Sequence, residues 1–385
     1  MEAGRFIASG IRFKGKMAVV ATAVSFFIII LSLAISGGFR QRIRSGLGEL
    51  SGDIAITGTR INYFSPEDPI RSDAAWLPGV ERVRGVREVR PVVYRAGIVK
   101  NEESIQGVLF KALPDTARLA VSIPRRLSDA LGLKPGDDML TYFVGERLAV
   151  RKFKVRDIYD PLVEADENMV VFAPLADIQR VNGWAPNEVS TMEVLLDNAY
   201  RARDIQRSKA GEIGIIASMT RGEDEPHVLA RAAADCYSAL FDWLDLIDFN
   251  VFTILLLMIL VAGFNMVSGL LIMLFRNIST IGTLKAMGMN DRGIGGVFLR
   301  VASGTVLKGM LWGNALALLF CLVQGTTHFI HLNPANYFVS FVPVHIDIVS
   351  IIAVDALAYV AIMLLLLIPS LFIAKVDPAD TVRVK

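Results

Sequence analysis

The sequence predicts a multi-pass membrane protein with four α-helical spans in a 1+3 order and a large mixed α/β domain inserted between helices one and two. Hydrophobic residues make up 53% of the 385 residues and charged residues 20%, whereas soluble domains average about 45–50% and about 25%. Four apolar runs each reach or nearly reach the ~20 residues that a helix needs to cross ~30 Å of hydrocarbon. A long segment of ordinary composition, 40–248, separates the first run from the second.

The four predicted spans are 17–39, 249–275, 297–325 and 348–374. A cleavable signal peptide is an alternative interpretation of the first, because Ala34-Ile35-Ser36 resembles a small-residue cleavage site. Its apolar run is longer than the 7–15 residues of a signal-peptide core, which favours a retained helix.

Basic residues near the spans predict the orientation, because Lys and Arg accumulate in cytoplasmic loops. They occur in the amphipathic lead-in 1–16, the loop 276–296 and the tail 375–385, whereas the loop 326–347 contains neither. Both termini and the loop 276–296 are therefore predicted to be cytoplasmic. The domain 40–248 and the loop 326–347 are predicted to be extracytoplasmic.

Within 40–248, alternating patterns and turn residues predict a mixed α/β fold. The predicted strands are 53–57, 89–99, 104–111, 139–144, 148–158, 169–172 and 191–196. Strands 89–99 and 104–111 are predicted to pair as a hairpin, and strands 139–144 and 148–158 as another. A helix over 125–131 is predicted to end at Gly132. Another is predicted over about 225–245, continuing into the second span.

The residues give no support for enzyme chemistry. Residues 10–16 match the first part of a P-loop, but Met17 stands where Ser or Thr must hold Mg²⁺, and no strand precedes it. Two Cys and four His lack the spacing of a disulfide scaffold or zinc site. With a net charge of +2, nucleic acid is not expected as a partner. We predict a non-enzyme without a metal site.

Lys308 and Asp355 are the predicted polar residues within the spans. Ionisable groups there are costly, and they are usually paired or face a polar interior. Two interpretations stay open: an ion pair across helices three and four, or Lys308 reaching toward the cytoplasm while Asp355 faces a wet cavity. Gly309 and Gly313 predict close approach of a neighbouring helix.

The loop between the second and third spans predicts a short amphipathic helix that ends at Gly288, with Asn290 and Asp291 capping the next helix. At 100° per residue, these residues fall on one half of this helix: Ile278, Ile281, Leu284, Met287 and Gly288. Thr280, Thr283 and Ala286 lie on the other half. Such a helix either lies among lipid headgroups or offers its apolar face to a cytoplasmic partner.

An ordered set of segments resembles the permease subunits of the lipoprotein-releasing ABC transporter, the LolC/LolE family, within a wider group of MacB-type and FtsX-like permeases. The segments span almost the whole chain: 36–40 (SGGFR), 130–137 (ALGLKPGD), 262–270 (AGFNMVSGL), 281–288 (IGTLKAMG), 308–314 (KGMLWGN), 337–343 and 377–383 (DPADTVR).

The resemblance implies a subunit of the bacterial inner membrane that couples ATP hydrolysis by a separate cytoplasmic ATPase to extraction of lipoproteins from the outer leaflet. The implied partners are that ATPase, a second permease subunit like or unlike this one, the lipoprotein cargo and a periplasmic lipoprotein carrier. The chain itself would need no cofactor, because ATP is bound by the ATPase.

The resemblance also assigns residues to two contacts. The ATPase would contact the helix of the cytoplasmic loop at Ile278, Ile281, Gly282, Leu284, Lys285, Met287 and Gly288. Acyl chains of the cargo would contact helices one and two at Leu33, Phe39, Val251, Phe252 and Leu255. The pair Gly37-Gly38 is expected to bend the first helix and let an acyl chain pass.

The sequence departs from the family pattern at a position of the ATPase contact and at the place of carrier docking, and two alternative functions also stay open. Thr280 stands where the family usually has Glu, and the turn 144–148 is short where the carrier-docking subunit has a long hook. The alternatives are a MacB-like mechanotransmission permease for efflux or secretion, and an FtsX-like regulator of cell-wall hydrolases. The length of 40–248 disfavours the regulator, and segments around Asn265 and Asn314 favour lipoprotein release over efflux.

Overall fold

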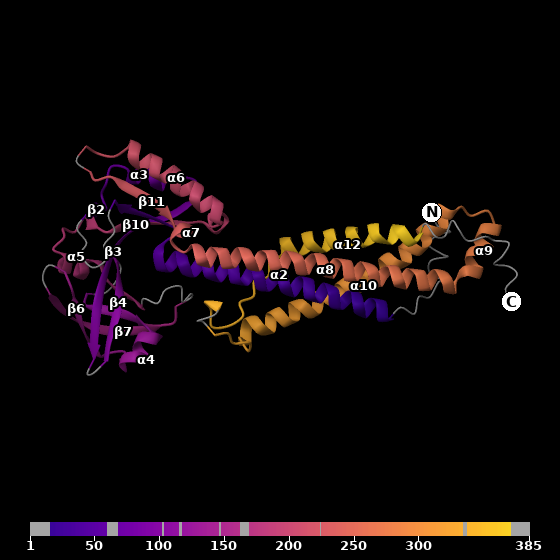
Figure 1. Cartoon of the computed structure of the whole chain (residues 1–385), viewed down its shortest axis with the longest axis horizontal. Helices are drawn as coiled ribbons and strands as arrows, with labels where there is room; N and C mark the ends of the chain where they lie inside the picture. Colours follow the sequence, from indigo (N-terminus) through magenta and orange to yellow (C-terminus); the bar gives the residue numbers. More distant parts are fainter. Residues whose placement is uncertain are drawn as a thin grey trace. The chain divides into compact units, whose positions relative to one another are not determined.

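The computed structural model describes residues 16–59, 68–101, 104–114, 118–145, 148–161, 169–223, 225–333 and 337–370. Most of the lead-in 1–16, the turn residues Glu146 and Arg147, and the tail 375–385 lie outside this part. The chain divides into two compact units (Figure 1). The helical unit comprises Met1–Gln41, Leu244–His331 and Phe341–Lys385, and the α/β unit comprises Arg42–Trp243 and Leu332–Ser340.

Among the described residues, four helices are long and apolar enough to cross a membrane, which confirms the 1+3 fold class. They are α2 (Lys16–Ser51), α8 (Ser238–Arg276), α10 (Asp291–Thr327) and α12 (Ile348–Ser370). Helix α2 continues past the predicted end of its span at 39, and α8 begins well before 249. Lipid demands apolar side chains only where a helix crosses it, so an apolar run marks the span and not the whole helix.

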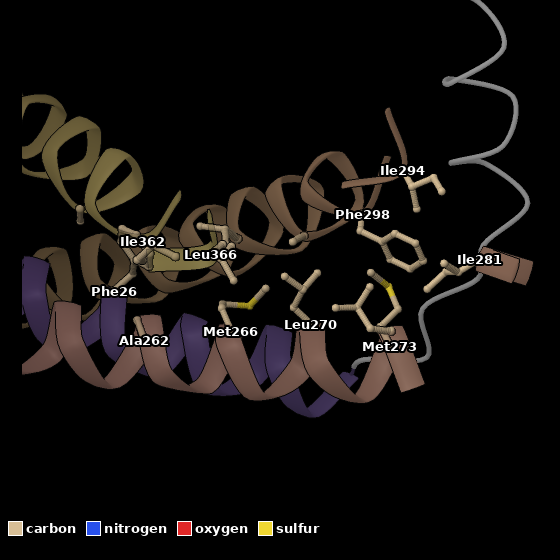
Figure 2. Packing of buried hydrophobic residues seen from close by; sticks show 14 residues of the cluster. Phe26, Ala262, Met266, Leu270, Met273, Ile281, Ile294, Phe298, Ile362 and Leu366 are labelled. Atoms are coloured by element: carbon tan, nitrogen blue, oxygen red, sulfur yellow. The ribbon is translucent and has the colours of Figure 1, made fainter. Parts of the chain in front are cut away.

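The main core of the helical unit is an apolar cluster to which all four long helices and the short helix α9 (Ile278–Ala286) contribute side chains. Figure 2 shows Met266, Leu270 and Met273 of α8 pointing toward side chains of the neighbouring helices. Phe26 and Phe298 are fully buried in the cluster. This packing holds α9 against the long helices.

Helices α2 and α10 approach closely at Gly309 and Gly313, as the glycine spacing predicts. A Cβ at Gly309 would lie 2.7 Å from Cβ of Thr22, and a Cβ at Gly313 would lie 2.5 Å from the carbonyl oxygen of Ala23. Only hydrogen fits at these two positions. The prediction of close helix packing is confirmed, and the neighbour is α2.

The α/β unit contains a large sheet with the strand order β11-β1-β10-β3-β4-β8-β5-β7-β6. Its strands are β1 (Ile54–Gly58), β3 (Val86–Asn101), β4 (Ser104–Leu113), β5 (Ala120–Pro124), β6 (Asp138–Phe143), β7 (Ala149–Tyr159), β8 (Met169–Pro174), β10 (Thr191–Leu196) and β11 (Val228–Ala232). Because β6 also pairs with β3, the strands from β3 to β6 in that order close into a ring. Phe110, Phe143 and Phe153 contact one another there.

The smaller elements cover this sheet or connect its strands. They are β2 (Ile70–Arg71) with β9 (Glu188–Val189), and α3 (Leu77–Glu81), α4 (Arg125–Leu131), α5 (Leu175–Asn182), η1 (Asn198–Tyr200), α6 (Arg203–Met219) and α7 (Ala233–Cys236). Both predicted hairpins are confirmed, as β3–β4 and β6–β7. Helix α4 ends at Gly132 with φ +65°, also as predicted.

The predicted helix over about 225–245 is wrong in its first part, whereas its continuation into the second span is confirmed by α8. Val228–Ala232 is strand β11, which pairs antiparallel with β1, and the long helix α8 begins only at Ser238. Leu229 and Ala233 have helical spacing to later residues, but backbone pairing with the edge of the sheet prevails over that local pattern.

Candidate functional sites

Helix α9 turns its apolar face toward its own chain. Ile281 is 1% exposed and belongs to the core cluster, and Leu284 packs against that cluster. In Figure 2, Ile281 lies close to Phe298 and Met273. Gly282 is also buried. The prediction that this apolar face is presented to a partner therefore needs correction, because α8 and α10 already cover it.

Lys285 is also engaged within the chain. Its Nζ lies 2.8 Å from Oδ1 of Asp291 at the start of α10, and its side chain is only 11% exposed. Asn290 caps α10 as predicted, with its Oδ1 accepting a hydrogen bond from the backbone N–H of Gly293. Together with the core contacts, the ion pair fixes α9 to the beginning of α10.

The free surface at α9 consists of the half that carries small and polar side chains, together with Met287 and Gly288, which follow the helix. Ile278 is half-buried, whereas these residues are exposed: Ser279, Thr280, Thr283, Ala286, Met287 and Gly288. Met287 is 79% exposed and is the only large apolar side chain among them. Of the residues assigned to the ATPase contact, Met287 and Gly288 are therefore the accessible ones.

The residues assigned to acyl-chain contact do not share one open surface. Phe252 is 64% exposed and Phe39 is 7% exposed. Val251 is half-buried, and Leu33 and Leu255 are half-buried against a second small cluster that contains Ile29 and Ile30. Only Phe252 offers a large side chain to the surroundings.

A polar link joins α2 to α8 near these residues. The hydroxyl of Ser36 donates to Oδ1 of Asp248 at 2.9 Å, and Nε of Arg40 lies 3.3 Å from the same oxygen. None of these residues was singled out from the sequence. The sequence did contain a signal for this polar link, because Asp248 is an acidic residue directly before the second apolar run.

The pair Gly37-Gly38 does not interrupt the helix, since α2 is continuous from Lys16 to Ser51. A Cβ at Gly38 would instead lie 2.3 Å from the carbonyl oxygen of Pro343. The N–H of His345 donates to the carbonyl oxygen of Ala34 at 3.0 Å. Gly38 therefore allows the segment before α12 to lie directly on α2.

Asp355 pairs with Asn314, not with Lys308. It is 8% exposed, and its Oδ2 accepts from Nδ2 of Asn314 at 2.5 Å. No ion pair joins it to Lys308, although both lie in described helices. The open interpretation of an ion pair across helices three and four is thereby excluded, and α10 and α12 are joined by an amide–carboxyl contact.

A double-mutant cycle on Asn314→Leu and Asp355→Leu should give a coupling of about 1 kcal/mol, the size of hydrogen bonds between transmembrane helices. The free energy of unfolding of the full chain in detergent provides the measurement. The matched cycle on Lys308→Met and Asp355→Leu should be additive within about 0.5 kcal/mol. Coupling to Lys308 without coupling to Asn314 would contradict the observed pairing.

The end of α2 in the α/β unit is held by a buried ion cluster that the sequence reasoning missed. Nζ of Lys111 lies 2.8 Å from a carboxylate oxygen of Glu193, and both side chains are 0% exposed. Lys111 also donates to the carbonyl oxygens of Glu49 and Leu50, each at 2.8 Å. Arg90 pairs with Glu193 at 2.7 Å. Cations thus meet the carbonyl end of α2, where its dipole is negative.

Burial lowers the pKa of Lys111 to about 8, and the charge of Glu193 opposes this shift. Next to this cluster, Asp53 accepts from the N–H of Leu196, from Nε of Arg201 and from Nε2 of Gln206. Burial raises the pKa of Asp53. A charged residue inside each of two apolar strands, VLFKAL and TMEVLL, was the available signal for the ion cluster.

Within the ranges that the structure describes, no three His, Cys, Asp or Glu side chains gather as metal ligands. The candidate sites are therefore surfaces and buried contacts. They are the exposed half of α9, the outward-facing Phe252, and the polar contacts that lock α2 to its neighbours.

Comparison with solved structures finds partial overlaps. The periplasmic region of MacB from Actinobacillus actinomycetemcomitans is 8% identical and covers 50% of this chain and 95% of that chain, with a TM-score of 0.33. The extracellular domain of the transporter YknZ from Gram-positive bacteria is 13% identical. The match covers 46% of this chain and 98% of that chain, with a TM-score of 0.30.

Comparison with known sequences covers nearly the whole chain. The LolC lipoprotein-releasing system transmembrane protein of Xylella fastidiosa (strain 9a5c) is 21% identical, over 97% of this chain and 94% of the relative. LolC of Neisseria meningitidis serogroup B is 22% identical, over 95% and 92%. LolE of Haemophilus influenzae is 24% identical, over 54% and 49%. Residues 252–378 match the family model described as FtsX-like permease C-terminal.

These matches bear out the resemblance read from the sequence. Permease subunits of this family are not themselves catalysts, and the family implies a partner ATPase and a second permease subunit. The four apolar helices and the relatives indicate a multi-pass protein of the inner membrane. The chain thus has an FtsX-like permease C-terminal region at residues 252–378, and over nearly its whole length it is similar to transmembrane proteins named LolC.

Proposed function

We propose that this permease couples ATP hydrolysis by a separate cytoplasmic ATPase to the extraction of lipoproteins from the outer leaflet of the inner membrane. In this proposal α9 faces the cytoplasm and the α/β unit faces the periplasm. A second permease subunit completes the membrane part, and a periplasmic carrier receives the cargo. The names of the LolC and LolE relatives, which belong to lipoprotein-releasing systems, support the cargo.

The exposed half of α9 is the observation that carries the proposal. A helix that transmits force must be accessible to its partner and fixed to the elements that it moves. α9 meets both conditions, because Met287 and Thr283 are exposed while Ile281 and the Lys285–Asp291 pair fasten the helix to α8 and α10. A partner that pushes on the exposed half would displace the ends of two spans.

The construction of α2 supports transmission toward the α/β unit. α2 is one unbroken helix whose residues belong to both units, with the division after Gln41. Its last turn is held by Lys111 and Arg90 in the buried ion cluster. Displacement of the last turn of α2 would therefore act on strands β3, β4 and β10, which carry the residues of the ion cluster.

Met287→Asp should weaken binding of the ATPase at least tenfold, because it places a charge in a contact that loses water on assembly. The measurement is co-purification with the ATPase and the ATPase rate of the assembled complex. Met219→Asp is the matched control, since Met219 is 81% exposed on α6 and Met287 is 79% exposed. Equal binding by both variants and the native chain would contradict a contact at α9.

A photo-crosslinker at position 252 should label lipoprotein in cells, and one at position 264 should not. Phe252 and Phe264 are both 64% exposed on α8. They are twelve residues apart, or about 18 Å at 1.5 Å per residue, so they lie in opposite leaflets. Labelling of lipoprotein at both positions or at neither would contradict capture from the outer leaflet.

The same experiment separates the two alternative functions. If position 252 labels only phospholipid or the second permease, and a cell-wall hydrolase activator is labelled from the α/β unit, an FtsX-like regulator is favoured. If an efflux or secretion partner is labelled instead, a MacB-like permease is favoured. Lipoprotein label that declines when ATP turnover begins supports release of the cargo.

A further inference from the structure

A groove of about 1010 Å³ lies on the helical unit between α2 and α10. Its walls are almost entirely apolar, with Phe27, Trp312 and Phe320 among the large side chains. The polar side chains that line it are Lys16, Lys308 and Thr305. This volume is at the upper end of the range for ligand pockets, which is about 300–1,000 Å³.

The two lysines lie at the same end of the groove. α2 and α10 are parallel, because Gly309 meets Thr22 while Gly313, one turn later, meets Phe26. Lys308 directly precedes Gly309, and Lys16 begins α2. Their backbones therefore differ in depth by about one helical turn, or ~5 Å. Flexible lysine side chains can reach a common level across that distance.

Neither ammonium group takes part in an ion pair with any other described residue. Lys308 lies seventeen residues into α10, within a span, where a positive charge without a counter-ion is costly. Two cations that line the same groove also repel each other. An anion between them would relieve both costs, and the groove supplies no carboxylate to do so.

The groove is longer on α10 than on α2. On α10 the lining residues run from Thr305 to Val323, about 27 Å at 1.5 Å per residue, and on α2 they run from Lys16 to Phe27, about 17 Å. Half of a ~30 Å hydrocarbon core is about 15 Å. An acyl chain whose head lies at the lysines would therefore reach the middle of the membrane along these side chains.

We propose that this groove binds an anionic phospholipid, with its phosphate between Lys16 and Lys308 and an acyl chain along Phe27, Trp312 and Phe320. An apolar transmembrane helix would leave both ammonium groups without a counter-charge, whereas an anionic lipid supplies one to both. The orientation proposed above places this lipid in the inner leaflet, opposite the leaflet of the cargo. The lipid would cover the contact between α2 and α10.

Tryptophan fluorescence provides a selective test. The chain has four tryptophans: Trp76, Trp184 and Trp243 belong to the α/β unit, and Trp312 lines the groove, 65% exposed. The full chain is reconstituted in vesicles with phosphatidylglycerol or phosphatidylcholine brominated on the acyl chains. Brominated phosphatidylglycerol should quench Trp312 at a mole fraction about tenfold lower than brominated phosphatidylcholine, given the attraction of two lysines for an anionic lipid. Trp312→Phe identifies the quenched signal.

The variant Lys16→Gln/Lys308→Gln should lose the preference for phosphatidylglycerol, while Lys100→Gln, an exposed lysine of the α/β unit, should keep it. Equal quenching by both lipids in the native chain would overturn the proposal, as would a preference that persists in the double variant. Displacement by an acylated lipopeptide at lower mole fraction than phosphatidylglycerol would also overturn it, in favour of cargo. The test contains no ATPase and measures no transport, so its failure is distinct from failure of the proposed function.

Discussion

Replacing Glu193 by Gln should lower the free energy of unfolding of the α/β unit by about 3–5 kcal/mol, the cost of breaking a fully buried ion pair from one side. Glu193 is the shared counter-charge of Lys111 and Arg90, at 2.8 and 2.7 Å. The amide keeps the shape of the side chain but removes its charge. Two neighbouring cations, one of them 0% exposed, would then lie together without an anion.

Hydrogen exchange of the full chain, followed on peptides from β3, β4 and β10, gives the measurement. The control is Glu212→Gln on α6, where Glu212 is 47% exposed and pairs with Lys209 at 2.8 Å. That surface pair contributes about 0–1 kcal/mol. Protection in Glu193→Gln equal to that in Glu212→Gln would show that the ion cluster does not stabilise the unit.

The same ion cluster is an example of a contact that the sequence alone does not predict. Lys111 and Glu193 are 82 residues apart, and each lies in a strand whose neighbours are apolar. Alternation predicts that such strands exist, and the strands were found. The alternation does not reveal which strands are neighbours in the sheet. A charged residue in one apolar strand therefore cannot be matched with its counter-charge in another from the sequence.

The four spans were predictable because hydropathy is a property of a single segment. The partner of Asp355 was not, because it depends on the register between α10 and α12. The sequence pointed to Lys308 because it is, like Arg300, a cation within the third predicted span. Asn314 lies six residues further along α10 and carries no charge, yet it is the residue that reaches Asp355.

Helix α9 was predicted as a helix with an apolar half, and the structure contains that helix. The mistake concerned what covers the apolar half. Periodicity reveals that a face needs cover, but Ile281 obtains it from Phe298 and Met273 of the same chain, not from a partner. The assignment of the partner surface therefore moves to Thr283, on the opposite half, and to the exposed Met287, directly after the last residue of the helix.

Gly313→Leu should separate α2 from α10 and cost about 3 kcal/mol of unfolding free energy, at the upper end of typical overpacking costs. Even the first added atom would lie 2.5 Å from the carbonyl oxygen of Ala23, 2.8 Å from Cβ of Phe26 and 3.0 Å from the backbone nitrogen of Phe27. Two of these atoms belong to the backbone of α2. They cannot rotate away, so the whole helix must move.

Gly304→Leu on the same helix is the control, because a Cβ there meets no atom within 4 Å. Leucine is a better helix former than glycine by up to about 1 kcal/mol, so this variant should be as stable as the native chain or slightly more so. Thermal unfolding of the full chain in detergent compares the two. Equal losses in both variants would mean that glycine matters for α10 itself. A loss confined to Gly313→Leu would locate the effect at the contact with α2, the helix whose other end is held by the buried ion cluster.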